Sequence, residues 1–145
     1  MIIWLTGQPG AGKTTLAKLL EAYFSDQSVI IDGDDLRELL KNTDYSENGR
    51  RKNIEYAQNM AKDLYYNEYN VIVSLVSPYK DQRELFKQDM GSSIKEVYVH
   101  TSNIRGKEHF HVHNYEAPTE NFVEIDTTDK GELETLQELV QKLNL

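Results

Sequence analysis

Residues 7–14, with the sequence GQPGAGKT, constrain this chain more than any other feature. They have the spacing G-x-x-x-x-G-K-[ST] and stand between an apolar run, residues 2–6, and a helix-like run that starts near Gly12. In a strand–loop–helix unit the glycines let successive main-chain N–H groups turn inward, and the positive end of the helix faces the same point. The pattern therefore predicts a loop that binds the phosphates of ATP or GTP.

Two side chains at the end of this loop add charge and a metal ligand. Lys13 can reach the β- and γ-phosphates, and the Thr14 hydroxyl can ligate Mg²⁺. The alternative, a chance glycine-rich turn, would not require the complete motif in this strand–loop–helix context. The residues expected to contact the nucleotide here are Gly7, Pro9, Gly10, Ala11, Gly12, Lys13, Thr14 and Thr15.

Short β-rich runs alternate with amphipathic segments along the chain. The β-rich runs are residues 2–6, 28–32, 70–76, 94–100 and 121–127. They are mostly too apolar for one wetted face, which is typical of central strands in a parallel sheet. We therefore expect an α/β chain with a three-layer P-loop nucleotide kinase fold, a central parallel five-stranded sheet, and ligands at the carboxyl ends of the strands.

Two segments show a helical period with one apolar face. In residues 50–66, apolar side chains recur at Ile54, Ala57, Ala61 and Leu64. In residues 131–143 the predicted apolar face consists of Leu133, Leu136, Val140 and Leu143. With 145 residues and no linker, the chain is expected to form one domain, residues 1–145.

Composition excludes several classes of function. The formal net charge of −8 disfavours a protein that coats nucleic acid, although local cations can still hold a small anionic substrate. The absence of cysteine removes thiolate catalysis, thiolate metal sites and disulfides. The apolar runs are too short for a membrane span and no leader-like start is evident, so we expect a cytoplasmic protein.

A second polar cluster lies in IIDGDDLRELL, residues 30–40. Asp32 ends the strand-like run and Asp34 follows it, so both carboxylates should face the γ-phosphate. One could accept a proton from an attacking hydroxyl while the other orients metal-bound water. The alternative is a helix N-cap, in which Asp34 or Asp35 only caps a helix over residues 35–40.

Further segments carry a resemblance to a known family. Beside the phosphate loop they are DGDDLR (32–37), YSENGRRKNI (45–54), SLVSPYKDQR (74–83) and, in part, NYEAPTE (114–120). Together they resemble the adenylylsulfate (APS) kinase family of P-loop kinases, which transfer the γ-phosphate of ATP to the 3′-hydroxyl of adenosine 5′-phosphosulfate. The likeness covers most of the chain.

The resemblance implies catalytic roles for individual residues. Asp34 would be the base near the acceptor 3′-hydroxyl, and Asp32 would support the water shell of the magnesium ion that Thr14 ligates. Lys13 would neutralise charge on the transferring phosphate. The implied cofactors are ATP and Mg²⁺.

The resemblance also implies an acceptor site. Arg37, Arg50 and Asn53 would hold the phosphosulfate and its ribose, and Tyr45 would stack on the adenine. Planar bidentate donors suit an oxyanion, and an aromatic face suits a base. The same matches place Ser77, Pro78 and Tyr79 at this site. The alternatives are a surface aromatic for Tyr45, a solvated charge at a helix start for Arg50, and for Ser77 a turn that Pro78 enforces.

Residues 101–114 depart from the family pattern. This lid-like segment is shorter than the family's and lacks its R-D-P-K-G-L-Y-like element, which leaves Arg105 and Lys107 as the basic residues that could reach the transferring phosphate. Of the two, Arg105 is expected at the nucleotide. Gly49 also replaces the acidic residue that usually precedes the arginine equivalent to Arg50.

Three histidines alternate within the lid-like segment, at positions 109, 111 and 113. On a strand they would share one face, which permits a metal site. No carboxylate or cysteine supports such a site nearby, so a solvated segment or a pH-sensitive phosphate contact is the favoured alternative.

These observations predict an ATP-dependent small-molecule kinase whose partner is a small anionic nucleotide, with APS first. The alternatives are a P-loop kinase for a different nucleotide or sugar hydroxyl, and a nucleotide-binding module without catalysis. Neither a nucleic-acid polymer nor a membrane is expected as a partner. The oligomeric state is left open, with a homodimer as one outcome.

Overall fold

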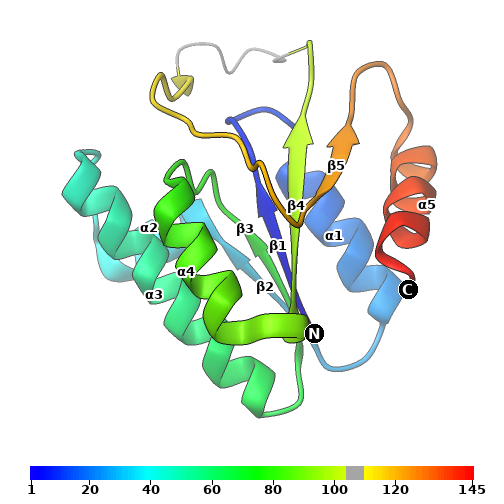
Figure 1. Ribbon diagram of the computed structural model, residues 1–145, viewed down its shortest axis with the longest axis horizontal. Coiled ribbons are helices and arrows are strands. Elements are labelled where there is room, and N and C mark those ends of the chain that lie inside the picture. The colour runs from blue at the N-terminus through cyan, green and yellow to red at the C-terminus, as the bar shows by residue number, and fades with distance from the viewer. Residues whose placement is uncertain (104–109) are drawn as a thin grey trace.

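Five parallel strands form the central sheet, in the order β2-β3-β1-β4-β5 (Figure 1). The computed structural model describes residues 1–103 and 110–145. The strands are β1 (Ile2–Thr6), β2 (Ser28–Asp32), β3 (Asn70–Ser74), β4 (Ile94–His100) and β5 (Val123–Asp126). The expected five-stranded parallel sheet is confirmed.

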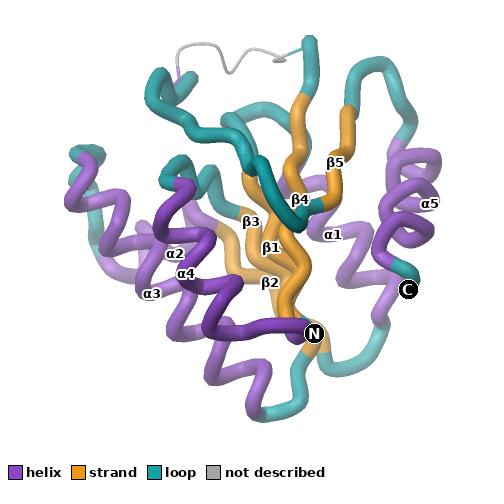
Figure 2. Tube along the Cα trace, viewed as in Figure 1, coloured by secondary structure: helices purple, strands orange, loops and turns teal. Residues whose placement is uncertain are grey.

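Helices cover both faces of this sheet (Figure 2). They are α1 (Lys13–Phe24), α2 (Gly33–Leu40), α3 (Glu47–Tyr66), α4 (Lys80–Met90) and α5 (Glu132–Leu143), with a 3₁₀ turn, η1 (Gly91–Ser93), before β4. Helices α1 and α5 pack on one face, and α2, α3 and α4 pack on the other. None of the described helices is long and apolar enough to cross a bilayer.

The core consists of two apolar layers separated by the sheet. Along β1, Ile2 and Trp4 belong to the layer under α2, α3 and α4, whereas Ile3 and Leu5 belong to the layer under α1 and α5. Each of these side chains is at most 3% exposed. Burial on both faces explains why the strand runs lack an alternating polar pattern.

The boundaries differ from the sequence prediction in two strands. The third strand ends at Ser74 rather than at residue 76, because the chain leaves the sheet there and Ser77 adopts a positive φ of 49°. The Val76 carbonyl instead accepts hydrogen bonds from Gly7 and Thr6. The fifth strand is shorter than residues 121–127 at both ends.

The predicted apolar face of the last helix is confirmed only in part: Leu143 is buried and Leu136 packs against the core. Leu133 is 66% exposed, whereas Leu139, which was not predicted, is fully buried. The buried row of α5 is Thr135, Leu139 and Leu143, spaced by four residues, so the face that packs against the domain is rotated from the predicted one. In α3, by contrast, the predicted residues Ile54, Ala57 and Ala61 are all buried.

A buried ion cluster fastens the segment before β5 to the domain. Glu96 accepts hydrogen bonds from Arg83 Nε at 2.9 Å and from Lys87 Nζ at 2.7 Å. The same cations donate to main-chain oxygens, Arg83 to Glu116 and Lys87 to Glu120. Because buried charges are stable only when paired, this cluster holds residues 116–120, which lead to the amino end of β5, against α4 and β4.

Candidate active site

The phosphate-binding motif forms the turn between β1 and α1, at the carboxyl edge of the sheet (Figure 1). Gly7, Gly10 and Gly12 adopt φ angles of 153°, 82° and 103°. A Cβ atom at Gly7 would lie 2.1 Å from the Val99 carbonyl oxygen, so only glycine allows this close packing on β4. Gly12 caps α1 without a side chain, which leaves the first N–H groups of the helix available to an anion.

Lys13 lies over the beginning of this loop. Its Nζ atom donates to the main-chain oxygens of Gly7, at 2.8 Å, and Gln8, at 2.9 Å, and the residue is only 8% exposed. The loop is braced from the other side by Thr127, whose hydroxyl donates to the Ala11 carbonyl at 2.7 Å. The ammonium group is therefore held at the mouth of the cradle that the main-chain N–H groups form.

Thr14 and Asp32 lie together at the end of β2. The Thr14 hydroxyl donates to Asp32 Oδ1 at 3.4 Å, and Asp32 Oδ2 accepts from the N–H groups of Asp34 at 3.1 Å and Asp35 at 3.3 Å. The N-cap of α2 is thus Asp32, because the helix begins at Gly33, and capping by Asp34 or Asp35 was a wrong alternative. One carboxylate oxygen caps the helix while the other meets the threonine hydroxyl.

Asp34 itself is exposed in the first turn of α2. Among the described residues, none forms a hydrogen bond or ion pair with its carboxylate. The group is therefore open to a ligand that approaches from the carboxyl edge of the sheet.

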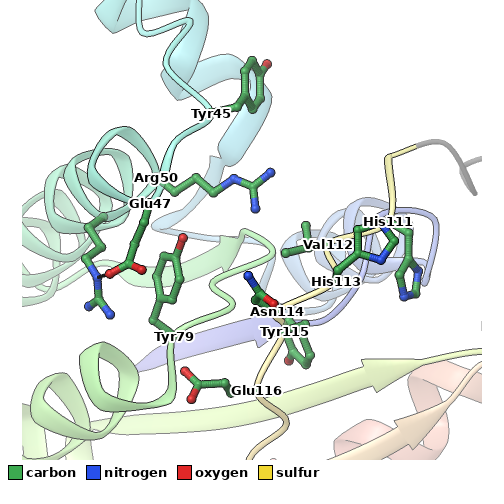
Figure 3. A pocket seen from close by; sticks show the side chains of 11 residues that line it. Tyr45, Glu47, Arg50, Tyr79, His111, Val112, His113, Asn114, Tyr115 and Glu116 are labelled. Carbon is green, nitrogen blue, oxygen red and sulfur yellow. Dashed lines mark hydrogen bonds and ion pairs between the residues drawn. The ribbon is translucent and has the colours of Figure 1, made fainter.

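A cavity of about 750 Å³ lies between α3 and the segment before β5 (Figure 3). Its lining combines residues from three parts of the chain: Tyr45, Glu47, Arg50, Arg51, Tyr79, and residues 111–116. It brings together Tyr45, Arg50 and Tyr79 of the predicted acceptor residues. Asp34, Arg37, Asn53, Ser77 and Pro78 are not part of the lining.

Arg50 is a half-buried cation in the lining of this cavity. Figure 3 shows its side chain extending from α3 toward the wall of residues 111–116. Within residues 1–103 and 110–145, no acidic side chain pairs with the guanidinium. One turn further along α3, the Asn53 amide is 4% exposed, and its Oδ1 atom has no hydrogen-bond partner in the described part of the chain. A half-buried unpaired cation favours an anionic ligand.

Arg37 takes a position that the sequence did not suggest. Its guanidinium lies over the Tyr45 ring, 4.1 Å from the centroid, and donates to the main-chain oxygens of Asn42 and Asp44. This arrangement fixes the turn between α2 and α3 and covers one face of the tyrosine.

The same turn explains the glycine at position 49. A Cβ atom there would lie 2.2 Å from the Asp44 carbonyl oxygen and 2.5 Å from its side chain, so the turn packs directly on α3. Asp44 in turn accepts hydrogen bonds from Ser46, which lower the pKa of its carboxyl group. An acidic side chain at Gly49 would not fit this packing.

Ser77 and Pro78 make hydrogen bonds to neighbouring segments behind the cavity. The Ser77 hydroxyl accepts a hydrogen bond from Trp4 Nε1 at 2.9 Å and is 2% exposed, and its carbonyl oxygen accepts from Arg83. The Pro78 carbonyl accepts from the Glu116 N–H at 2.9 Å. Both residues hold the cavity wall in place rather than line it.

Several residues of the site were missed in the sequence. Arg51 pairs with Glu47 and Asp81, which raises its pKa, and lies over the Tyr79 ring at 4.2 Å. The i,i+4 spacing of Glu47 and Arg51 could have predicted this pair. Ser74 was also missed: it ends β3 in register with Asp32, and its buried hydroxyl has no partner among the described residues.

Tyr115 belongs to the wall of the cavity and contacts the end of β1. Its phenol is 2.8 Å from the Thr6 hydroxyl, and its ring stacks on Tyr98 at 5.9 Å. Burial raises the pKa of Tyr115 well above its ordinary value, and the hydrogen bond with Thr6 only partly opposes this. The phenol therefore stays neutral and available as a hydrogen-bonding group.

The predicted cation Arg105 lies outside the described residues, as do Lys107 and His109. The other two histidines of the lid-like segment line the cavity, with the rings of His111 and His113 in an edge-to-face arrangement 6.0 Å apart. In the described part of the chain no group of three or more metal-ligating side chains occurs.

The chain is similar to known proteins both in sequence and in fold. The profile of the adenylylsulphate kinase family matches residues 1–125. The adenylyl-sulfate kinase of Pseudomonas aeruginosa strain PAO1 is 40% identical over 105 residues, which cover 69% of this chain and 54% of that protein. A probable adenylyl-sulfate kinase of Pyrococcus abyssi is 42% identical over 102 residues, 68% of this chain and 58% of that protein.

The fold agrees with a solved structure along nearly its whole length. The APS kinase of Mycobacterium tuberculosis in complex with AMPPNP and APS superposes with a TM-score of 0.83 at 24% identity, covering 99% of this chain and 97% of the other. The aligned region spans little more than half the length of the two curated relatives. From the match over residues 1–125 and the identity with these relatives, the chain belongs to the adenylylsulphate kinase family.

Proposed function

We propose that this chain is an ATP-dependent kinase that phosphorylates the 3′-hydroxyl of adenosine 5′-phosphosulfate. The observation that carries the proposal is the cavity beside the phosphate loop, into which Arg50 extends without an acidic partner among residues 1–103 and 110–145. One wall of this cavity is bonded to the loop itself, through Gln8 and Val112. Family membership supports the reaction class, and the M. tuberculosis relative binds an ATP analogue and APS.

On the donor side, the loop residues 7–15 would hold the ATP phosphates through main-chain N–H groups and Lys13. The hydroxyl of Thr14, at the start of α1, and the carboxylate of Asp32, at the N-cap of α2, fit a magnesium ion, because both are hard oxygen ligands and lie 3.4 Å apart. Bound there, Mg²⁺ would neutralise charge on the β- and γ-phosphates. We place Arg105, from the lid-like residues 101–114 of this single domain, at the nucleotide as well.

On the acceptor side, Arg50 would pair with the phosphosulfate group, since a planar guanidinium can donate two parallel hydrogen bonds to an oxyanion. Asn53 Oδ1, which has no partner among the described residues, would accept from a ribose hydroxyl. Tyr45 would stack on the adenine through the face that Arg37 leaves open. Tyr79 would bound the cavity beside α4.

The chemistry would be an in-line transfer. The 3′-oxygen forms a bond to the γ-phosphorus, the bond from that phosphorus to the β,γ-bridging oxygen breaks, and ADP leaves. Asp34 accepts the proton of the 3′-hydroxyl, for which its open carboxylate is suited. Lys13 stabilises the charge that develops on the transferred group.

A coupled assay of ADP release tests the proposal. When MgATP and APS are both present, the wild-type protein should release one ADP for each APS consumed. Lys13→Ala should abolish this turnover. Turnover with another nucleotide or with a sugar acid, and none with APS, would reassign the acceptor. Binding of MgATP without turnover on any acceptor would make the chain a nucleotide-binding module.

A further inference from the structure

The residues on either side of Gly7 hold the wall of the acceptor cavity. Gln8 Nε2 donates to the Val112 carbonyl at 2.7 Å, and Gln8 Oε1 accepts from the Val112 N–H at 2.8 Å. On the other side of Gly7, the Thr6 hydroxyl lies 2.8 Å from the Tyr115 hydroxyl. The wall over residues 112–115 is therefore attached at both ends to the start of the phosphate loop.

The contact with Gln8 uses one N–H donor and the acceptor oxygen of its side-chain amide. It satisfies both the donor and the acceptor of Val112, much as a neighbouring strand would. Val112 is 8% exposed, so losing the two bonds would remove the partner of its buried N–H and leave its carbonyl with only the longer bond of 3.4 Å from the Tyr115 N–H. The flanking His111, His113 and Asn114 line the cavity, and their positions follow that of Val112.

The same residue is part of the phosphate loop through its main chain. The Gln8 carbonyl accepts from Lys13 Nζ at 2.9 Å and from the Ala11 N–H at 3.2 Å. A phosphate that attracts Lys13 would change the hydrogen bonds at this carbonyl. Position 8 is also a variable position of the phosphate-binding motif, so phosphate binding does not itself require a glutamine there.

We propose that Gln8 is a positioning residue that couples nucleotide binding in the phosphate loop to the shape of the acceptor cavity. Phosphates fix the main chain of Gln8, and its side chain fixes the wall of residues 111–115 at the distance that the acceptor needs. The identity of the acceptor rests on the proposed function, whereas the coupling rests only on nucleotide binding.

Hydrogen exchange tests the coupling without any acceptor. Gln8→Met keeps the length and most of the volume of the side chain but removes both hydrogen bonds, and Gln88→Met, at an exposed position of α4, is the matched control. In the wild type and in the control, magnesium–AMPPNP should slow amide exchange in residues 111–116 roughly tenfold, the effect expected from stabilising two hydrogen bonds. Gln8→Met should lose this response while its Kd for the nucleotide stays within about threefold.

Steady-state kinetics provide a second test of the role of Gln8. Gln8→Met should raise KM for the acceptor roughly tenfold and leave KM for ATP within about twofold, because only the cavity wall is released. Gln8→Asn, whose amide is too short to reach, should behave in the same way and guards against a folding defect specific to methionine.

The outcomes separate the two proposals. A wild type that binds AMPPNP but turns over no APS defeats the proposed function, and the exchange experiment still decides the coupling. Nucleotide-dependent protection that persists in Gln8→Met, or that is missing from the wild type, would overturn the role of Gln8. An acceptor KM that is unchanged in both Gln8 variants would also overturn it.

Discussion

Arg37 and Tyr45 form a stacked pair in which the guanidinium lies 4.1 Å from the ring centroid. The tyrosine is 62% exposed, so its second face remains open to solvent and to the mouth of the cavity. A base can therefore add to the open face of a ring that the arginine already orients. Because the arginine also holds the turn through the Asn42 and Asp44 carbonyls, the ring is in place before a ligand arrives.

Tyr45→Ala should raise KM for APS roughly tenfold, since stacking of a base on an aromatic side chain contributes about 1–3 kcal/mol. Tyr45→Phe keeps the ring and should stay near the wild type. Tyr56→Ala, at an exposed tyrosine of α3, is the control. Equal KM values for Tyr45→Ala and this control would show that no base stacks there.

Asp32→Asn tests the two roles of the Asp32 carboxylate separately: the N-cap of α2 and the proposed magnesium site. Asparagine caps a helix about as well as aspartate, so the free energy of unfolding should stay within about 1 kcal/mol of the wild type. The charge that suits magnesium is lost, so the Mg²⁺ concentration for half-maximal activity should rise at least about tenfold. Unaltered magnesium dependence would leave Asp32 with the capping role alone.

Asp34→Asn tests the proposed base. The variant keeps the shape of the side chain but accepts no proton, so kcat should fall by about 10² to 10⁴, with little change in the Kd for MgATP. Asp35→Asn changes the neighbouring carboxylate in the same turn of α2 and should retain most activity. If the two variants lose equal activity, the effect belongs to the charge of the helix start and not to a base.

The raised pKa of the buried Tyr115 phenol predicts that the free energy of unfolding depends on pH. Burial raises its pKa in the folded protein above the ordinary value of 10.0, so above that pH the unfolded tyrosine loses its proton while the folded one keeps it. Its stabilising contribution is therefore present below pH 10 and is lost as pH rises from there toward the folded pKa. Tyr115→Phe cannot ionise at this position and lacks the bond to Thr6.

Urea denaturation of wild type and Tyr115→Phe at two pH values measures this contribution. Near pH 8 the wild type should be more stable by about 1 kcal/mol, the usual contribution of a hydrogen bond. Near pH 11 the advantage should shrink by roughly 1 kcal/mol or more. Because both proteins contain the other tyrosines, the contributions of those residues cancel in the difference between the two free energies of unfolding. A difference that is constant across this range would contradict the linkage.

The sequence predicted the parts of the molecule that depend on local pattern. Parallel strands buried on both faces follow from apolar runs, and the turn between β1 and α1 follows from glycines whose positive φ angles other residues rarely adopt. Arg50 was placed near the acceptor from a motif match, and the structure puts it in the cavity lining. The predicted roles of these residues stay predictions that the variants above test.

Contacts between distant segments could not be predicted in this way. The bonds of Gln8 to Val112 join residues 104 positions apart, and Gln8 is at a variable position of its motif. Ser77 binds Trp4 across 73 positions, which turns its hydroxyl away from the cavity. Such contacts depend on how side chains face one another once the sheet has formed, and neither spacing nor composition records that.

Transfer of labelled phosphate tests the central claim most directly. The protein is incubated with Mg²⁺, ATP labelled at the γ-phosphate and APS, and the nucleotides are separated and identified. The account predicts label on the 3′-oxygen of APS in the wild type, and only a trace in Lys13→Ala and Asp34→Asn. Label that stays in ATP, or that appears only as free phosphate when APS is present, would contradict it.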